Sequence, residues 1–266
     1  MRFERMRPDQ VAAAVAAGLP FVLPVGVLPV GVLPIGVLPV GVLPIGVMEY
    51  HGQHLPAGVD LLAVTEVLAR LGDRIVVLPP LFAYGAASHA VAGPVGTGTL
   101  HVDATALLPF AEGLFAALLR AGLTNIHGVI HHQTEGFDQG MPTDLAFRLA
   151  ARNAILRHLE TTHGPGWWGD RAMQDYYARQ AQGDDPFNWI RIHPLFPKGA
   201  AFPFDHAGIG ETALMQALAP GTVALERAGI GDHWYTETAP QATAAMGEAG
   251  VALALAHLER CLGIGV

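Results

Sequence analysis

The sequence has little charge and almost no cysteine. Charged residues make up 14% of the 266 residues, and the formal net charge is −8. Binding to nucleic acid requires a basic surface, so this composition argues against nucleic acid as the main partner. The single cysteine, Cys261, rules out an internal disulfide framework and fits a reducing cytoplasm. With 51% hydrophobic residues the chain is globular in composition, and its length suits one α/β domain over residues 1–266.

Charged residues are absent altogether from Val11 to Val47. A run of this length is long enough for a membrane span, and the arginines at positions 2, 5 and 7 would also suit a signal peptide. However, a proline stands at every fifth position from Pro24 to Pro44, and each interior proline destabilises a helix by about 3 kcal/mol. Lipid accommodates only helices and closed barrels. We therefore expect no membrane span, with a membrane-associated protein using residues 11–47 as the alternative.

The same segment repeats the phrase LP[VI]GV five times between Leu23 and Val47. Side chains alternate along a strand with period two, so successive five-residue copies would present opposite faces. Proline is also confined to edge strands or first strand positions. The five copies therefore cannot be equivalent strands. We expect the last copy, or a split between the first and last, to form the first buried strand. We interpret the surplus as a tolerated duplication, with a role at a subunit contact as the alternative.

Helix and strand patterns alternate along the rest of the chain. The sequence predicts helices at Pro8–Ala17, Asp60–Leu71, Asp103–Leu119, Pro142–Leu159, Glu211–Ala217 and Ala239–Leu262, and further strands at Arg74–Leu78, Asn125–Ile130 and Ile190–His193. This order indicates a three-layer α/β/α fold in which helices cover both faces of a mainly parallel sheet. Residues 83–101 form a candidate active-site loop, and residues 164–186, with Trp167 and Trp168, a possible lid.

Polar clusters follow two of the predicted strands directly: EYHGQH after the repeat and HHQTEG after Ile130. In open α/β sheets, ligands bind beyond the carboxyl ends of strands. Glu49 and His51 stand two residues apart, which in an extended chain directs both side chains to one side. Gly52 allows a turn that could return Asp60 to them. Two carboxylates and an imidazole are a ligand set for Zn²⁺ or Mn²⁺, although solvated loop residues would give the same spacing.

Other histidines carry less information from their spacing alone. His131 and His132 would point to opposite sides of an extended chain, so at most one would face the same centre. His206 precedes the predicted helix that opens near Glu211 and could relay protons, because an imidazole has a pKa of about 6.5. The alternative is that Asp205 or Thr212 caps the helix while His206 merely packs.

Three segments in this order resemble the creatininase (creatinine amidohydrolase) family. They are LPIGVMEYHGQHLPAGVD at residues 43–60, HAGIGETALMQALAP at 206–220 and ATAAMGEAG at 242–250. The resemblance spans nearly the whole chain. It implies a three-layer α/β/α fold, a cytoplasmic homo-oligomer (a hexamer), and a centre of two divalent ions, zinc and/or manganese with iron possible.

Ligands follow from the resemblance residue by residue. Glu49 would bind one ion, His51 the other, and Asp60 would bridge them. His132 falls on the family's histidine ligand of the first ion. His206 falls on the family's catalytic histidine. Two further side chains, Glu211 and His131, would stand behind the ligands and support them.

The chain departs from the family pattern at the second ion. In creatininase proper, the residue two places after the histidine ligand is a glutamate that binds this ion, whereas here that place is Thr134. Glu135 lies one residue further on. Either Glu135 takes the metal-binding and catalytic role through a local backbone shift, or water holds the second ion more weakly.

The function implied by this resemblance is hydrolysis of a small cyclic amide or related C–N bond by metal-activated water. His206 would protonate the leaving nitrogen. The alternatives are a related hydrolase (a formamide deformylase, a peptide-trimming enzyme, or a ring-opening hydrolase of a sugar- or inositol-derived compound) and a metal-binding protein without catalysis. Three other histidines, His54, His89 and His101, are candidates for the pocket lining, of which we expect two to be bystanders.

Overall fold

A single parallel sheet organises the structure, a computed structural model that describes residues 5–16, 40–78, 83–91, 93, 96–132, 137–231 and 233–264. Its four described strands lie in the order β2-β1-β3-β4. They are β1 (Gly41–Ile45), β2 (Val76–Val77), β3 (Ile126–Ile130) and β4 (Ile190–Pro194). Every pair of neighbouring strands is parallel, which confirms the predicted sheet type.

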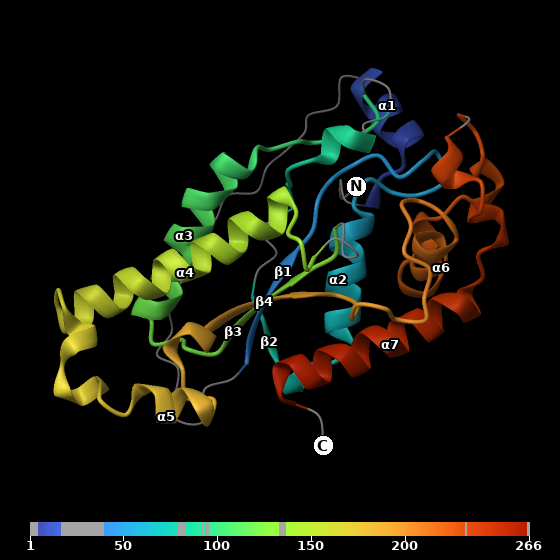
Figure 1. Cartoon of the computed structure of the whole chain (residues 1–266). Coiled ribbons are helices and arrows are strands. Elements are labelled where there is room, and N and C mark those ends of the chain that lie inside the picture. The colour runs from blue at the N-terminus through green and yellow to red at the C-terminus, as the bar shows by residue number, and fades with distance from the viewer. Residues whose placement is uncertain are drawn as a thin grey trace.

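Helices cover both faces of this sheet (Figure 1). The described helices are α1 (Pro8–Ala16), α2 (Val59–Ala69), α3 (Ala104–Arg120), α4 (Pro142–His163), α5 (Tyr176–Ala181), α6 (Ile209–Leu218) and α7 (Ala244–Leu262). Leu43 and Ile45 of β1 pack into a core with α3 and α4, whereas Val42 packs into a second core with α2, α6 and α7. Two cores on opposite sides of one sheet confirm the three-layer α/β/α fold.

Strand β1 explains how a proline-rich repeat can enter a sheet. Leu78 donates its N–H to the carbonyl of Val42, so the backbone N–H and C=O groups of the even-numbered residues of β1 point towards β2. Pro44 has no N–H to donate. Its backbone also points to the side of β2, but β2 ends at Val77, so the sheet loses no hydrogen bond there. The strand joins the end of the fourth copy to the start of the fifth. The first three copies lie outside the described residues, so their interpretation as a duplication stays a prediction.

The glycine of the last repeat copy brings β1 close to α2. A Cβ atom built on Gly46 would lie 2.4 Å from the backbone nitrogen of Leu61. Only glycine permits this approach, which places the first turn of α2, with Asp60, beside the chain that leaves β1. At Gly41, by contrast, the same Cβ would meet its nearest atom at 3.8 Å. The glycine requirement therefore belongs to the last copy of the repeat.

Element boundaries differ from the predicted ones in places with local causes. Only Val76–Val77 of the predicted strand Arg74–Leu78 pairs, because Gly72–Arg74 forms a 3-10 turn first. Asp103 stands at the start of α3, but its carboxylate contacts His101 Nε2 at 3.1 Å and does not cap the helix. Helix α7 begins at Ala244, where the Thr243 hydroxyl accepts the N–H of Met246. Among the described residues, no helix is both long and apolar enough to cross a membrane.

Candidate metal centre

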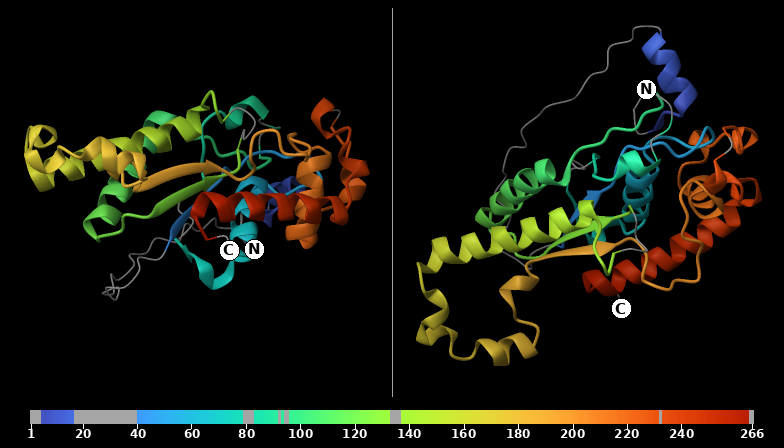
Figure 2. Two further views of the ribbon diagram at one scale, coloured as in Figure 1. Left: turned by 60° about the horizontal axis from the view of Figure 1, so that its bottom comes forward. Right: turned by 45° about the horizontal axis from the view of Figure 1, so that its top comes forward.

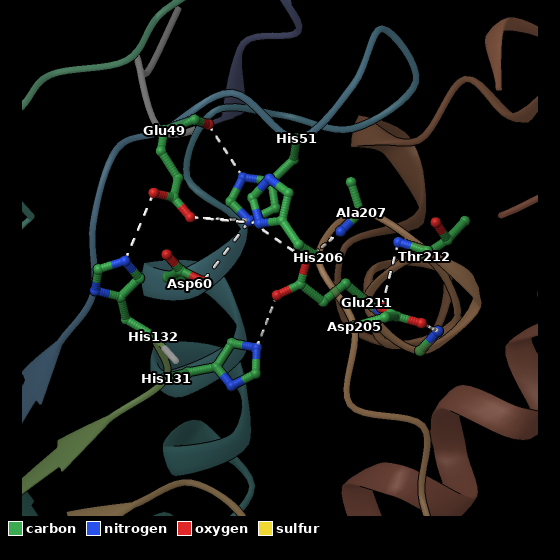
Figure 3. Close-up of polar contacts among 12 residues, drawn as sticks. Glu49, His51, Asp60, His131, His132, Asp205, His206, Ala207, Glu211 and Thr212 are labelled. Carbon is green, nitrogen blue, oxygen red and sulfur yellow. Dashed lines mark hydrogen bonds and ion pairs between the residues drawn. The ribbon is translucent and has the colours of Figure 1, made fainter. Parts of the chain in front are cut away.

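Seven described ionisable side chains gather just beyond the carboxyl ends of β1 and β3 (Figure 3). They come from the loop after β1, the first turn of α2, the residues after β3, and the start of α6. They are Glu49, His51, Asp60, His131, His132, His206 and Glu211. Because all four strands are parallel, their carboxyl ends meet at one edge, where the sequence predicts the site.

His51 stands at the middle of the cluster and is completely buried. Its Nδ1–H donates to the backbone carbonyl of Glu49 at 3.0 Å, which leaves Nε2 to face the carboxylates. Nε2 lies 3.4 Å from Glu211, 3.7 Å from Asp60 and 3.9 Å from Glu49. The imidazole is therefore oriented by the backbone, and its second nitrogen is presented to three negative charges.

A tight loop returns Asp60 to this position. Gly52 has φ +72°, a left-handed conformation that few other residues adopt without strain. The backbone N–H of Glu49 then donates to the carbonyl of Ala57 at 2.9 Å, which closes the loop. Asp60 lies in the first turn of α2 and is 2% exposed. The return predicted from the Gly52 turn is present in the structure.

Both histidines after β3 contact carboxylates of the cluster. His132 Nε2 lies 3.6 Å from Glu49 Oε2, and His131 Nε2 lies 3.2 Å from Glu211 Oε1. The expectation that at most one of them would face the centre is wrong. It assumed an extended chain, whereas β3 ends at Ile130 and the backbone bends at His132.

The start of α6 is held by Asp205 and by a strained residue. The Asp205 carboxylate accepts the N–H groups of Gly208, Gly210 and Glu211 at 3.2, 2.7 and 3.2 Å, so Asp205 caps the helix as the sequence alternative proposed. Ala207 has φ +54°, which costs a non-glycine residue about 1–2 kcal/mol. In this conformation its N–H donates to Glu211 Oε2 at 2.6 Å. The turn therefore orients the Glu211 carboxylate towards the centre.

His206, on the same turn, reaches the other side of Glu49. Its Nε2–H donates to the carbonyl of Tyr50 at 2.8 Å, and Nδ1 lies 3.5 Å from Glu49 Oε1. A carbonyl can only accept, so the hydrogen is on Nε2 and Nδ1 presents its lone pair to the cluster. The His206 side chain is 21% exposed, which makes it the most accessible of the histidines in this contact network.

Charges in the cluster compensate one another. Burial alone would lower the pKa of His51, but Glu211, Asp60 and Glu49 outweigh it and raise that pKa to about 10. Burial would raise the pKa of the Glu49 carboxyl, yet the neighbouring His132, His51 and His206 lower it. The pKa of Glu211 is likewise held well below its usual value by the histidines against burial. The carboxylates are thus ionised and attract a positive charge at this point.

Two neighbouring histidines remain neutral. Burial, followed by the charge on His51, lowers the pKa of His206. The same two causes lower the pKa of His54 to about 4. The His54 Nε2 atom lies 2.9 Å from the Thr212 hydroxyl of α6, so His54 joins the loop after β1 to that helix. Its function is therefore to hold the site together.

Donor atoms of this cluster fit a divalent metal ion. Three groups of ligand atoms lie within 4.8 Å of one another: Glu49–Asp60–His132, His51–Asp60–Glu211 and Glu49–His51–His206. His51 Nε2 and Glu49 Oε2 are buried and make no hydrogen bond. Burying such atoms without a hydrogen bond is costly, and imidazole with carboxylate is the donor chemistry of Zn²⁺, Mn²⁺ and Fe²⁺ sites.

A family model described as creatinine amidohydrolase matches residues 37–256. The chain belongs to the creatininase family. A creatinine amidohydrolase from Pseudomonas putida is 28% identical over 190 residues, which cover 70% of this chain and 66% of that protein. The chain therefore matches slightly less than two thirds of the length of this curated relative.

Solved creatininases share the fold of this family member. A tryptophan-to-phenylalanine mutant of creatininase superimposes with a TM-score of 0.62 at 21% identity, covering 97% of this chain and 95% of the other. The manganese form of creatininase gives 0.60 at 20% identity with the same coverage. At these identities the likeness establishes the architecture.

Beside the cluster lies a cavity of about 580 Å³. Its described lining includes Glu49, Asp60, His131, His132, His206 and Glu211. The rest of the described lining is largely apolar. It includes Ala87 and five aromatic residues that the sequence analysis did not identify: Phe196, Phe202, Phe204, Trp234 and Tyr235. Ala87 belongs to the predicted active-site loop, so that loop does reach the cavity. The aromatic residues carry no polar signal by which a sequence pattern could have found them.

Other predicted residues lie elsewhere or cannot be placed. Glu135, for which a metal-binding and catalytic role was predicted, lies outside the described residues. His89 and His101 stack on each other with ring centres 4.2 Å apart, and neither is among the described residues that line the cavity. Residues 164–186 contribute no described lining residue. They lie beyond the end of α4, on the opposite side of the molecule from α6 (Figure 2), so a lid formed by them stays a prediction.

Proposed function

We propose that this creatininase-family protein is a metal-dependent amidohydrolase that cleaves a C–N bond in a small, partly apolar amide. The observation that supports the proposal best is the pair of ligand groups that share Asp60, with His206 directed at their edge. Support also comes from solved creatininases in a manganese form, in a zinc–zinc form, and in complex with creatine.

Two sets of side chains would hold the ions. Glu49, Asp60 and His132 would hold the first, and His51 with Asp60 would hold the second. Such ions supply a Lewis acid and lower the pKa of bound water from 15.7 to about 7. The backbone supports the ligands directly, since the Glu49 carbonyl fixes the His51 ring. Orientation by such surrounding contacts typically changes metal affinity by about 10- to 100-fold.

His206 is the residue that would move protons. With its hydrogen on Nε2 and bonded to Tyr50, neutral His206 presents Nδ1 as a base toward the cluster. Nδ1 accepts a proton from the attacking water and returns it to the nitrogen of the breaking C–N bond, so no net proton is consumed in the exchange. Proton transfer by a positioned side chain of this kind contributes about 10²- to 10⁴-fold in rate.

The apolar residues that line the cavity support this substrate class. Phe196 and Phe202 stack with ring centres 5.2 Å apart, and Phe204 meets Phe196 edge-on. An amide bound at the carboxylates and histidines would leave the rest of the molecule in a cavity that these rings line. Cyclic amides and formamides with a flat apolar group fit this description.

Metal-loaded protein tests the proposal. We expect wild-type protein loaded with Mn²⁺ or Zn²⁺ to hydrolyse at least one member of a panel of cyclic amides and formamides. His206→Asn should lower kcat by about 10²- to 10⁴-fold while metal content stays at the wild-type level. His163→Asn at the exposed end of α4 is the matched control and should change neither quantity.

Two results would contradict the proposal. Metal-loaded wild-type protein that hydrolyses no panel member would support a metal-binding protein without catalysis. Full activity in the His206→Asn variant would remove the proton-transfer role from His206 but leave the metal centre in place.

A further inference from the structure

The second ion of the proposed centre lacks an assigned third ligand. In creatininase proper, a glutamate two residues after the histidine ligand binds this ion, whereas this chain has Thr134 at that place. Among the residues that the structure describes, the candidates are the side chains that surround His51 and Asp60. Glu211 is the side chain that meets both of them.

Two ligand groups can be occupied at the same time. Glu49–Asp60–His132 and His51–Asp60–Glu211 have only Asp60 in common, so one ion in each would be bridged by that carboxylate. The third group, Glu49–His51–His206, takes one member from each of the other two and competes with both. Among these ligand groups of described residues, the arrangement that fills two sites therefore includes Glu211 and leaves His206 free for proton transfer.

Glu211 is also oriented in the manner of a ligand. Its Oε2 atom lies 3.4 Å from His51 Nε2 and accepts the N–H of Ala207, while Oε1 lies 3.2 Å from His131 Nε2. A carboxylate oxygen has two lone pairs, so Oε2 can accept the Ala207 N–H and still bind a cation. Glu211 is 6% exposed, and His51 Nε2 beside it is buried without a hydrogen bond.

We propose that Glu211 is the third protein ligand of the second divalent ion, in place of the glutamate that creatininase proper has two residues after its histidine ligand. This inference rests on the proposed two-ion centre. It gives the second site one imidazole and two carboxylates, the same donor set as the first. In this chain the third ligand thus comes from the start of α6, and the strained turn at Ala207 holds it in place.

Metal binding by Glu211→Gln tests the assignment without using activity. We expect wild-type protein to bind two Mn²⁺ or Zn²⁺ ions per chain in a chelator competition, and Glu211→Gln to bind one tightly. Glutamine keeps an oxygen to accept the Ala207 N–H but loses the charge. Affinity for the second ion should fall by more than about 100-fold, because loss of a merely supporting residue costs about 10- to 100-fold.

Two other variants complete the experiment. Glu112→Gln is the matched control, since Glu112 is a buried carboxylate on α3 that contacts Asn153 and Arg157. It should retain two ions. Glu135→Gln should also retain two ions, because Glu211 already completes the second site.

The outcomes separate the two proposals. Two tightly bound ions in Glu211→Gln, or loss of the second ion only in Glu135→Gln, would overturn the assignment of Glu211 while the amidohydrolase proposal stands. Wild-type protein that binds one ion would overturn it as well. Should Glu211→Gln fail to fold by circular dichroism, Glu211→Asp decides: a ligand role predicts a weakened second ion that more metal restores, and an unchanged second ion contradicts it.

Discussion

At the scale of single residues, a second histidine pair lies in the sheet, outside the metal centre, with His127 buried and His193 half-buried. His127 donates from Nε2 to the Asn125 side-chain oxygen at 3.0 Å, so its Nδ1 accepts from His193 Nε2 at 2.9 Å. Burial, then His193 and Arg191, lower the pKa of His127 to about 3. Burial, then Arg191 and His257, lower that of His193 to about 4. Both rings are therefore neutral in the folded protein at neutral pH.

This pair should make the protein sensitive to acid. A histidine in the unfolded chain has a pKa of about 6.5, so between that pH and about 4 the unfolded state binds protons that the native state does not. Stability is therefore retained above about pH 6.5 and lost as the pH falls, at about 1.4 kcal/mol per pH unit for each histidine. We expect His127→Gln to reduce the slope of the unfolding free energy against pH by about this amount, measured by urea unfolding from pH 7 to 4.

His193→Gln provides the comparison from the other side of the same hydrogen bond. It should also flatten the acid slope, and the double variant should flatten it further. If both single variants follow the wild-type curve, the pair does not titrate on unfolding as its burial requires.

Residue patterns predicted much of the centre but not all of it. The spacing of Glu49, His51 and Asp60 was informative because a strand end and a glycine turn constrain where side chains can point. The sequence did not predict that both His131 and His132 face the cluster, since their orientation depends on where β3 ends. The sequence predicts only a supporting role for Glu211. The strained backbone of Ala207, four residues earlier, directs the Glu211 carboxylate at His51, and no local sequence pattern reveals that conformation.

At the scale of elements, the contact between β1 and α2 fixes the geometry of the site. Gly46→Ala would place a methyl group 2.4 Å from backbone atoms of α2 that cannot move independently of Asp60. We expect a loss of about 1–3 kcal/mol of stability, since overpacking of this kind costs that much, and weaker metal binding. Chemical denaturation and metal titration measure the two effects.

Gly41→Ala is the matched control from the preceding copy of the repeat. The added methyl group would meet its nearest neighbour, the Asn125 carbonyl, at 3.8 Å, which is ordinary contact. Stability should change by less than about 1 kcal/mol, and metal binding should stay the same. Equal effects of the two substitutions would show that the last repeat copy has no special role.

The order and type of the elements were predictable because apolar periodicity and the Gly and Pro signals are local. Helices at Pro142 and Asp60 began within one residue of the predicted position. Strand β2 shortened because pairing depends on the neighbouring strand and not on its own sequence, and Val76 and Val77 remain partly exposed at the sheet edge. Local sequence thus indicates an element, whereas its partner sets its length.

At the scale of the whole molecule, bound metal should stabilise the fold. The proposed ligands come from the loop after β1, from α2, from the residues after β3 and from α6, so an ion would bind only the native arrangement. At a free metal concentration of 100 times Kd, such binding adds about 2.7 kcal/mol. Since 1 kcal/mol shifts Tm by about 2–4 °C for a protein of roughly this size, chelation should lower Tm by roughly 5–10 °C.

Glu49→Gln serves as the reference in this measurement. Its Tm should respond far less to chelator, because it lacks a carboxylate that faces His132 and His51. A wild-type Tm that is the same with and without chelator would argue against a metal that the folded protein holds.

Several large side chains remain exposed on the single chain. Trp234 is 80% exposed, Tyr177 72% and Phe110 57%. These surfaces are compatible with the homo-oligomer predicted from the sequence. Its subunit number and the cytoplasmic location stay predictions.

The hydrogen bond between His206 and Tyr50 joins residues 156 positions apart in the chain. Contacts of such long range close only after the intervening segments have collapsed, because loop closure must come before the contact contributes any energy. A nascent chain that ends before α6 would hold only part of the cluster. Binding of a metal ion with full affinity would therefore require that the chain has been synthesised and folded through α6.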